Sequence, residues 1–129
     1  MEEVSDLVNA AIKAANNAYA PYSKFKVGCA IRASSGKIYT GCNVENVSYP
    51  VGTCAEAGAI AAMVNGGDNK IDEILVYADS GILISPCGAC RQRIVEFSDK
   101  NTRVYLSNKD GVQKIIEVED LLPYCFREF

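Results

Sequence analysis

Three cysteines and one glutamate stand out because their spacing suits a metal site with an acid–base group beside it. Cys87 and Cys90 are three residues apart at a predicted helix start, so their side chains return to nearly the same side of the helix. Cys54 and Glu56 are two residues apart and can address one site only if Cys54 lies at or before the first turn. Three thiolates around zinc leave its fourth position open to water, which is typical of a catalytic site.

The charge of such a site needs compensation. Three thiolates outweigh one divalent ion by a single negative charge, and this excess weakens the power of the metal to acidify bound water. Cys54 and Cys87 both precede predicted helices, whose free N–H groups and dipoles favour negative charge. Helix N-termini are therefore one expected source of compensation.

Two other interpretations of the cysteines have to be weighed. A Cys-x-x-Cys pair alone is also typical of a redox dithiol or of buried thiols. A structural zinc module would need a fourth protein ligand, and no fourth cysteine stands near the other three in a recognisable pattern. The sequence contains no histidine, which excludes imidazole ligands and Ser-His-Asp or Cys-His catalysis. Acid and base chemistry must then fall to residues such as Glu56.

Composition limits the class of partner. The chain has 129 residues, with 13 Lys and Arg against 16 Asp and Glu, and its formal net charge is −3. This acidic balance argues against nucleic acid as the partner, because that affinity depends on Lys and Arg. The first residues lack the basic flank and apolar run of a signal peptide, and we expect no membrane association. A cytoplasmic protein with a single domain over residues 1–129 and no disulfide framework is predicted.

The hydrophobic pattern predicts alternating helices and strands. Apolar residues at helical spacing between 4 and 15 indicate an amphipathic helix, and alternation from Phe25 to Ile31 indicates a half-buried strand. Further strands are expected at 38–41, 71–78, 102–107 and 112–118, and further helices at 54–64 and from Cys87 onwards. Helices interleaved with strands favour an α/β fold, a three-layer α-β-α sandwich around a five-stranded mixed sheet.

Several segments, in this order, resemble a known family. They are residues 22–28, 41–46, 54–56, 86–92, 121–123 and Phe126. Together they cover nearly the whole chain and resemble the small, zinc-dependent, three-cysteine cytidine deaminases. The resemblance implies hydrolytic deamination of cytidine and 2′-deoxycytidine to the uridine products and ammonia, in pyrimidine salvage. The implied partner is a small pyrimidine nucleoside.

The resemblance also implies roles for the metal-site residues. Cys54, Cys87 and Cys90 would hold Zn²⁺, and Glu56 would be the catalytic proton shuttle. It would take a proton from the metal-bound water, deliver it to N3 of the pyrimidine and help ammonia leave C4. The backbone of Ala55 would meet the base.

The remaining implied residues contact the nucleoside. Asn43 and Glu45 would hydrogen-bond the ribose hydroxyls, and Phe25 would pack on the base. Tyr49 and Phe126 would enter the site of a neighbouring subunit, which implies a homotetramer with shared active sites.

One position departs from the family pattern. The small deaminases commonly have Arg directly after the catalytic Glu, where it offsets thiolate charge, but this chain has Ala57. We expect helix N-termini and Arg91 to share that task. Ala57 also keeps open an alternative, the related aminonucleoside deaminases that act on blasticidin S. A polynucleotide-editing deaminase is disfavoured by the acidic charge.

Overall fold

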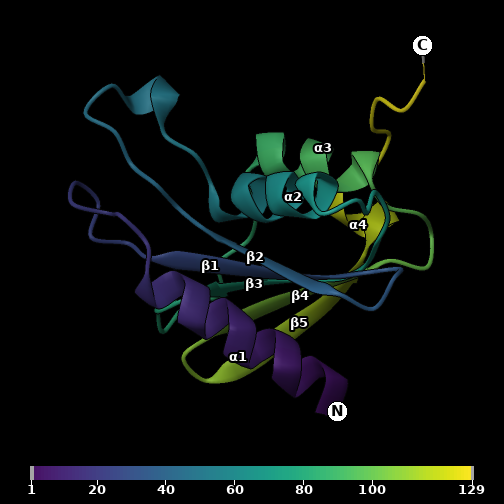
Figure 1. The fold of residues 1–129 in the computed structure, drawn as a ribbon, viewed down its shortest axis with the longest axis horizontal. Helices are drawn as coiled ribbons and strands as arrows, with labels where there is room; N and C mark the ends of the chain where they lie inside the picture. The colour runs from purple at the N-terminus through teal and green to yellow at the C-terminus, as the bar shows by residue number, and fades with distance from the viewer. Residues whose placement is uncertain (1, 129) are drawn as a thin grey trace.

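The computed structural model describes residues 2–128 and contains the predicted order of elements (Figure 1). The helices are α1 (Glu2–Asn16), α2 (Ala55–Asn65), α3 (Gly88–Glu96) and α4 (Val118–Leu121), with a 3-10 turn at Tyr49–Val51. The strands are β1 (Val27–Ala33), β2 (Ile38–Cys42), β3 (Ile71–Ala78), β4 (Arg103–Asn108) and β5 (Gly111–Glu117). The first strand begins at Val27, later than the predicted Phe25, because hydrogen bonds with Asn43 and Glu45 hold the preceding residues in a loop, in which Lys24 has a φ of 61°.

The five strands form one mixed sheet in the order β2-β1-β3-β4-β5. β1 pairs with β2 and with β3 in antiparallel fashion, and β4 pairs with β5 in the same way. β3 and β4 are parallel, and α3 lies in the connection between them. The sheet and its helices confirm the predicted fold class.

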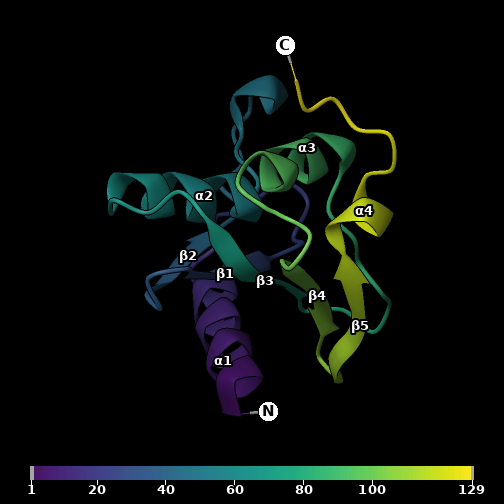
Figure 2. The same cartoon turned by 90° about the vertical axis from the view of Figure 1, so that its right-hand side faces the viewer.

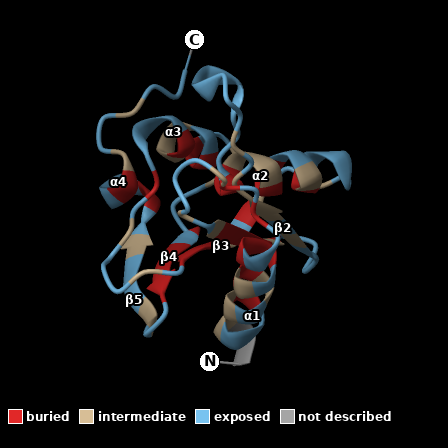
Figure 3. Cartoon of the chain, turned by 90° about the vertical axis from the view of Figure 1, so that its left-hand side faces the viewer, coloured by how far each residue is buried: buried red, intermediate tan, exposed pale blue. Residues whose placement is uncertain are grey.

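Helices cover both faces of the sheet, with α2 and α3 on one face and α1 on the other (Figures 1 and 2). The alternation of β3 explains this arrangement. Ile74 and Val76 belong to the core cluster that includes α2 and α3 residues, whereas Leu75 and Tyr77 pack in the cluster that includes α1 residues. The buried parts of the helices accordingly face the sheet (Figure 3).

Two glycines allow helices to lie very close to the sheet. A Cβ built on Gly28 would lie 1.9 Å from the carbonyl oxygen of Ala11 in α1. A Cβ built on Gly41 would lie 2.3 Å from the nitrogen of Ala59 and 2.4 Å from the oxygen of Ala55, both in α2. The β2–α2 contact therefore requires glycine at position 41, and it sets the height of the first turn of α2 above the sheet.

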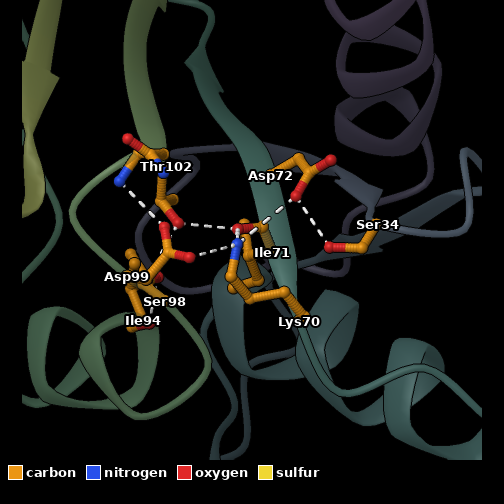
Figure 4. A network of polar contacts seen from close by, with 9 residues as sticks. Ser34, Lys70, Ile71, Asp72, Ile94, Ser98, Asp99 and Thr102 are labelled. Atoms are coloured by element: carbon orange, nitrogen blue, oxygen red, sulfur yellow. Dashed lines mark hydrogen bonds and ion pairs between the residues drawn. The ribbon is translucent and has the colours of Figure 1, made fainter.

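A polar network fixes the start of the parallel strand pair (Figure 4). The hydroxyl of Thr102 donates to the carbonyl of Ile71 at 2.7 Å. The ammonium of Lys70 lies 3.3 Å from a carboxylate oxygen of Asp72 and 3.2 Å from one of Asp99. These contacts tie the segment after α3 to the beginning of β3.

Candidate active site

The N-termini of α2 and α3 carry the predicted metal ligands. Cys54 is the N-cap residue of α2 and Cys87 is the N-cap residue of α3, each with extended backbone, ψ being 157° and 167°. Cys90 lies three residues further, within α3. Cys54 thus precedes the first turn, which is the condition that the sequence set for Cys54 and Glu56 to address one site.

The three sulfur atoms converge. The Sγ atoms of Cys54, Cys87 and Cys90 all lie within 4.8 Å of one another. Cys90 is buried, whereas Cys54 and Cys87 are exposed. Zn–S bonds of about 2.3 Å in a tetrahedron hold sulfurs at comparable separations, so the donor set fits zinc. Across residues 2–128, the cluster of potential ligands at this position contains these three side chains and no carboxylate or fourth cysteine.

The three thiols stand in different electrostatic surroundings. The backbone N–H of Cys90 lowers the pKa of the Cys87 thiol, because it stabilises the thiolate at the helix N-terminus. Burial raises the pKa of the Cys54 thiol. Burial, and next the charge of Glu56, raise the pKa of the Cys90 thiol. A cation is therefore needed to hold all three sulfurs as thiolates together.

Glu56 is the buried acid–base candidate beside the sulfurs. It lies in the first turn of α2 and is 5% exposed. Burial raises its pKa, while its own backbone N–H and the charge of Arg93 act in the opposite direction. A carboxyl group whose pKa is raised can hold and release a proton nearer to neutral pH.

A cavity of about 510 Å³ opens next to Cys54. Of the predicted site residues, Asn43, Glu45, Tyr49 and Cys54 line it. The other lining residues are Tyr22, Ser23, Val44, Asn46, Gly52 and Thr53. Phe25, Ala55, Glu56 and Phe126, all among the described residues, lie outside this lining. The cavity is thus formed by the segment between β2 and α2 and by residues 22 and 23.

Asn43 and Glu45 hold the loop that precedes β1. The Oδ1 of Asn43 accepts a hydrogen bond from the Val27 N–H at 2.8 Å, and its Nδ2 donates to the Phe25 carbonyl at 2.8 Å. The carboxylate of Glu45 accepts from the Tyr22 N–H at 2.9 Å, and also from the N–H and hydroxyl of Ser23. The hydroxyl of Ser23, together with these N–H groups, lowers the pKa of Glu45, which keeps it an ionised acceptor.

Tyr22 and Ser23 also belong to the site, although they were not predicted as site residues. Their place in the 22–28 segment, which resembles the family, was the one indication in the sequence. Their hydrogen bonds to Glu45 depend on the fold, which brings together residues more than 20 positions apart. The ring of Tyr22 meets that of Tyr49 edge-on at 6.3 Å between centroids, and Tyr49 is 77% exposed. Phe126 is also exposed, and its carbonyl accepts a hydrogen bond from Gln92 of α3 at 2.9 Å.

The guanidinium of Arg91, which was expected to share in offsetting the thiolate charge, makes its hydrogen bonds to oxygen atoms. Its Nε donates to the carbonyl of Pro86 at 2.8 Å, its Nη1 donates to the carbonyl of Leu121 at 2.9 Å, and its Nη2 donates to the Ser85 hydroxyl. Arg91 therefore ties the loop before α3 to α4.

Comparisons with known proteins agree with this geometry. The family model for the cytidine and deoxycytidylate deaminase zinc-binding region matches residues 1–106. A cytidine deaminase of Sporosarcina psychrophila is 44% identical over 124 residues, 96% of this chain and 91% of the relative. A cytidine deaminase of Mycoplasma pneumoniae is 44% identical over 116 residues, 88% of this chain and 86% of the relative.

Solved structures match as well. A crystal structure of cytidine deaminase from Burkholderia pseudomallei superposes with a TM-score of 0.89 at 40% identity, covering 95% of this chain and 98% of the other. One from Mycobacterium tuberculosis superposes with a TM-score of 0.81 at 34% identity, covering 95% of each chain. Similarity of this extent, over the segments that carry the sulfurs, leaves one conclusion: the chain belongs to the zinc-binding cytidine and deoxycytidylate deaminase family.

Proposed function

We propose that this protein is a zinc-dependent deaminase that converts cytidine and 2′-deoxycytidine to uridine and 2′-deoxyuridine with release of ammonia. The observation that carries the proposal is the convergence of three sulfurs from two helix N-termini, within 4.8 Å, beside a buried glutamate. Family membership and the names of the relatives support the same reaction.

Cys54, Cys87 and Cys90 would hold the zinc, which supplies a Lewis acid that makes a coordinated water acidic. Glu56 moves the protons of the reaction. Its carboxylate takes a proton from the attacking water and gives it to N3 of the pyrimidine, while the water oxygen bonds to C4. A second proton passes from the new hydroxyl group on C4 through Glu56 to the exocyclic amine. The C4–N bond then breaks to release ammonia, and the oxygen remains on C4 as the carbonyl group of the product. Burial of Glu56 suits it to both tasks, because burial raises its pKa and so makes the protonated form more accessible than it is for an exposed glutamate.

Asn43 and Glu45 retain hydrogen-bonding capacity for a sugar. The amide of Asn43 uses one acceptor site and one donor for the 25–27 backbone, so one of each remains for a hydroxyl group. The carboxylate of Glu45 accepts three hydrogen bonds out of about four that it can take. Both residues line the cavity beside Cys54, which supports a pose with the ribose end of a nucleoside in the cavity and the pyrimidine towards the sulfurs.

The base is expected to contact Phe25 and the backbone of Ala55. Phe25 follows the loop that Glu45 holds, and its carbonyl is bound by Asn43. The same side chain that recognises the ribose therefore positions the residue that packs on the base. Ala55 is buried directly between Cys54 and Glu56, so its backbone lies next to the reacting end of the site.

Assembly as a homotetramer with shared active sites is part of the proposal. Tyr49 and Phe126 are 77% and 63% exposed, although both are large and apolar. Exposed aromatic side chains are typical of a surface that another protein covers. Tyr49 is one of the residues that line the cavity, so an aromatic side chain of a neighbouring copy that packs there could complete it.

We also propose that residues 1–129 act as one domain in pyrimidine salvage in the cytoplasm. All six cysteines are unpaired, which suits a reducing compartment. Among residues 2–128, no helix combines the length and the apolar character needed to cross a bilayer.

The decisive experiment is to count zinc per chain and to follow the absorbance of cytidine, 2′-deoxycytidine and blasticidin S in parallel. We expect bound zinc and turnover of cytidine and 2′-deoxycytidine. The Glu56→Gln variant should keep its zinc and lose several orders of magnitude in kcat, because the proton shuttle is gone. Stoichiometric zinc without turnover of any nucleoside would identify a structural zinc module instead. Deamination of an oligonucleotide but not of cytidine would also overturn the proposal.

A further inference from the structure

The site described above carries more negative charge than its metal can neutralise. Three thiolates and one divalent ion leave one excess negative charge, and the buried carboxyl of Glu56 lies close to the same sulfurs. The helix N-termini supply partial positive charge at Cys54 and Cys87, which are N-cap residues. Cys90 lies inside α3 and is buried, so it depends more on a side chain for compensation.

One cationic side chain reaches that sulfur. The Nη1 of Arg93 donates to the Sγ of Cys90 at 3.5 Å. The two residues are three positions apart in α3, so their side chains share one side of the helix. Among the hydrogen bonds of residues 2–128, this is the contact that joins a cationic side chain to the sulfur cluster. The guanidinium of Arg91 instead donates hydrogen bonds to oxygen atoms of Ser85, Pro86 and Leu121.

Arginine suits this position because its guanidinium stays charged and donates in a fixed direction. Arg93 is exposed while Cys90 is buried, so the guanidinium meets the sulfur from the solvent side. A hydrogen bond from a cation withdraws electron density from a thiolate, which leaves the metal a stronger Lewis acid. Removing a group that hydrogen-bonds to a metal ligand commonly changes metal affinity or activity by about 10- to 100-fold, and solvent screening of the exposed Arg93 favours the lower end of that range.

We propose that Arg93 is the positioning residue that offsets the excess negative charge of the three-cysteine site, acting through its hydrogen bond to Cys90. This inference rests on the proposed function, because it takes Cys54, Cys87 and Cys90 as the ligands. The positive charge that offsets the thiolates then comes from α3, because Ala57 in α2 carries no charge.

A simpler role for Arg93 has to be separated from this one. Arg93 lies in the last turn of α3, where any cation interacts favourably with the helix dipole. That role stabilises the helix whether or not metal is bound. Charge compensation instead acts on the loaded site, so the two roles differ in the metal-dependent measurements.

The test uses Arg93→Gln and Arg93→Lys, with Arg103→Gln as the control. Arg103 is exposed on β4, so its variant removes the same charge away from the sulfurs. Each protein is loaded with Co²⁺, its sulfur-to-cobalt charge-transfer band is recorded, and its metal affinity is measured by competition with a chelator. Loss of the hydrogen bond raises the energy of the sulfur electrons, so the band should move to longer wavelength in Arg93→Gln.

The affinity of Arg93→Gln should fall roughly five- to tenfold, the size expected for one solvent-screened charge a few ångströms away. Arg93→Lys should recover part of the affinity, because it restores the charge but not the directed N–H. Arg103→Gln should match the wild type in both measurements. An Arg93→Gln protein whose band and affinity equal those of Arg103→Gln would overturn the inference.

Different results would refute the proposed function and the role of Arg93. A wild-type protein that binds no stoichiometric metal, or that binds it without deaminating cytidine, refutes the proposed function. A wild-type protein that does both, with Arg93→Gln unaltered in band and affinity, refutes the role of Arg93 alone. Because Arg93 is exposed, its replacement leaves no cavity in the core, and the unfolding midpoint of the metal-free protein checks that the helix persists.

Discussion

Replacing Gly41 by alanine adds one methyl group between β2 and α2 and tests how the site is held in place. The added Cβ would lie 2.3 Å from the nitrogen of Ala59 and 2.4 Å from the oxygen of Ala55. Ordinary contacts of this kind are about 3.5 Å, so the strand and the helix must separate by roughly 1 Å. Backbone atoms cannot rotate away as a flexible side chain can, which makes the separation unavoidable.

The expected cost has two parts. Overpacking of this kind destabilises a protein by about 1–3 kcal/mol. At roughly 4 °C per kcal/mol for a chain of this size, the unfolding midpoint should fall by about 4–12 °C. The first turn of α2 also carries Cys54 and Glu56, and a displacement near 1 Å at a reacting group costs on the order of 100-fold in rate. Both the stability and kcat of Gly41→Ala should therefore fall.

Gly58→Ala is the matched control, because Gly58 lies on the opposite side of the same contact. A Cβ on Gly58 would lie 3.6 Å from the Cα of Gly41, which is ordinary van der Waals contact. The helix should gain about 0.5–1 kcal/mol from the loss of a glycine in its interior. Calorimetry of the metal-free proteins and cytidine turnover of the loaded ones measure the pair. If Gly41→Ala has the midpoint and kcat of the wild type, the close approach does not set the position of α2.

Two further predictions concern the substrate cavity. If Phe126 completes the site of a neighbouring subunit, removing residues 123–129 or replacing Phe126 by alanine should raise KM for cytidine roughly tenfold or more, the value of one buried aromatic contact. Steady-state kinetics measures KM, and light scattering measures the mass of the assembly. An unchanged KM in a variant whose mass equals that of the wild type would contradict that placement. The pKa of Glu45 lies below its usual 4.5 because Ser23 and the neighbouring N–H groups stabilise its carboxylate. Its hold on the 22–23 loop should therefore persist above pH 4.5 and be lost as the pH falls through the lowered pKa. Protection of the Tyr22 and Ser23 amides from hydrogen exchange should differ between wild type and Glu45→Gln at pH 6, and the difference should shrink as the pH falls below 4.5; a constant difference would show that the charge is irrelevant.

The fold was predictable because the spacing of apolar residues and the positions of turn-forming residues indicated the same helices and strands along most of the chain. The 71–78 strand matches β3 in its bounds, and its alternation places successive residues in the two core clusters. The expected strand start at Phe25 was wrong by two residues. Asn43 and Glu45 hold the 22–27 segment in a loop through hydrogen bonds that span about twenty residues of sequence. The local alternation of apolar and polar residues cannot predict such contacts.

The metal ligands were predictable for a different reason. Cys87 and Cys90 lie on one helix, where spacing alone fixes their proximity, and Cys54 was constrained by its place before a predicted helix. The hydrogen bond from Arg93 to Cys90 was not predicted, although the same spacing rule favours it, because Arg93 is three residues from Cys90 on α3 and Arg91 is only one. The contact of Arg91 with the Leu121 carbonyl depends on the position of α4, which the sequence does not give.

The site therefore depends on two helices that are anchored independently. The close contact at Gly41 sets the height of α2, and Arg91 fastens the start of α3 to α4. Neither anchor touches the sulfurs, yet together they decide whether Cys54 meets Cys87 and Cys90. A metal bound to Cys54, Cys87 and Cys90 would link the N-termini of α2 and α3, which are otherwise positioned independently, and would therefore stabilise their relative position. Substitutions at these anchors should consequently weaken metal binding and catalysis together, whereas substitutions at Glu56 should separate them.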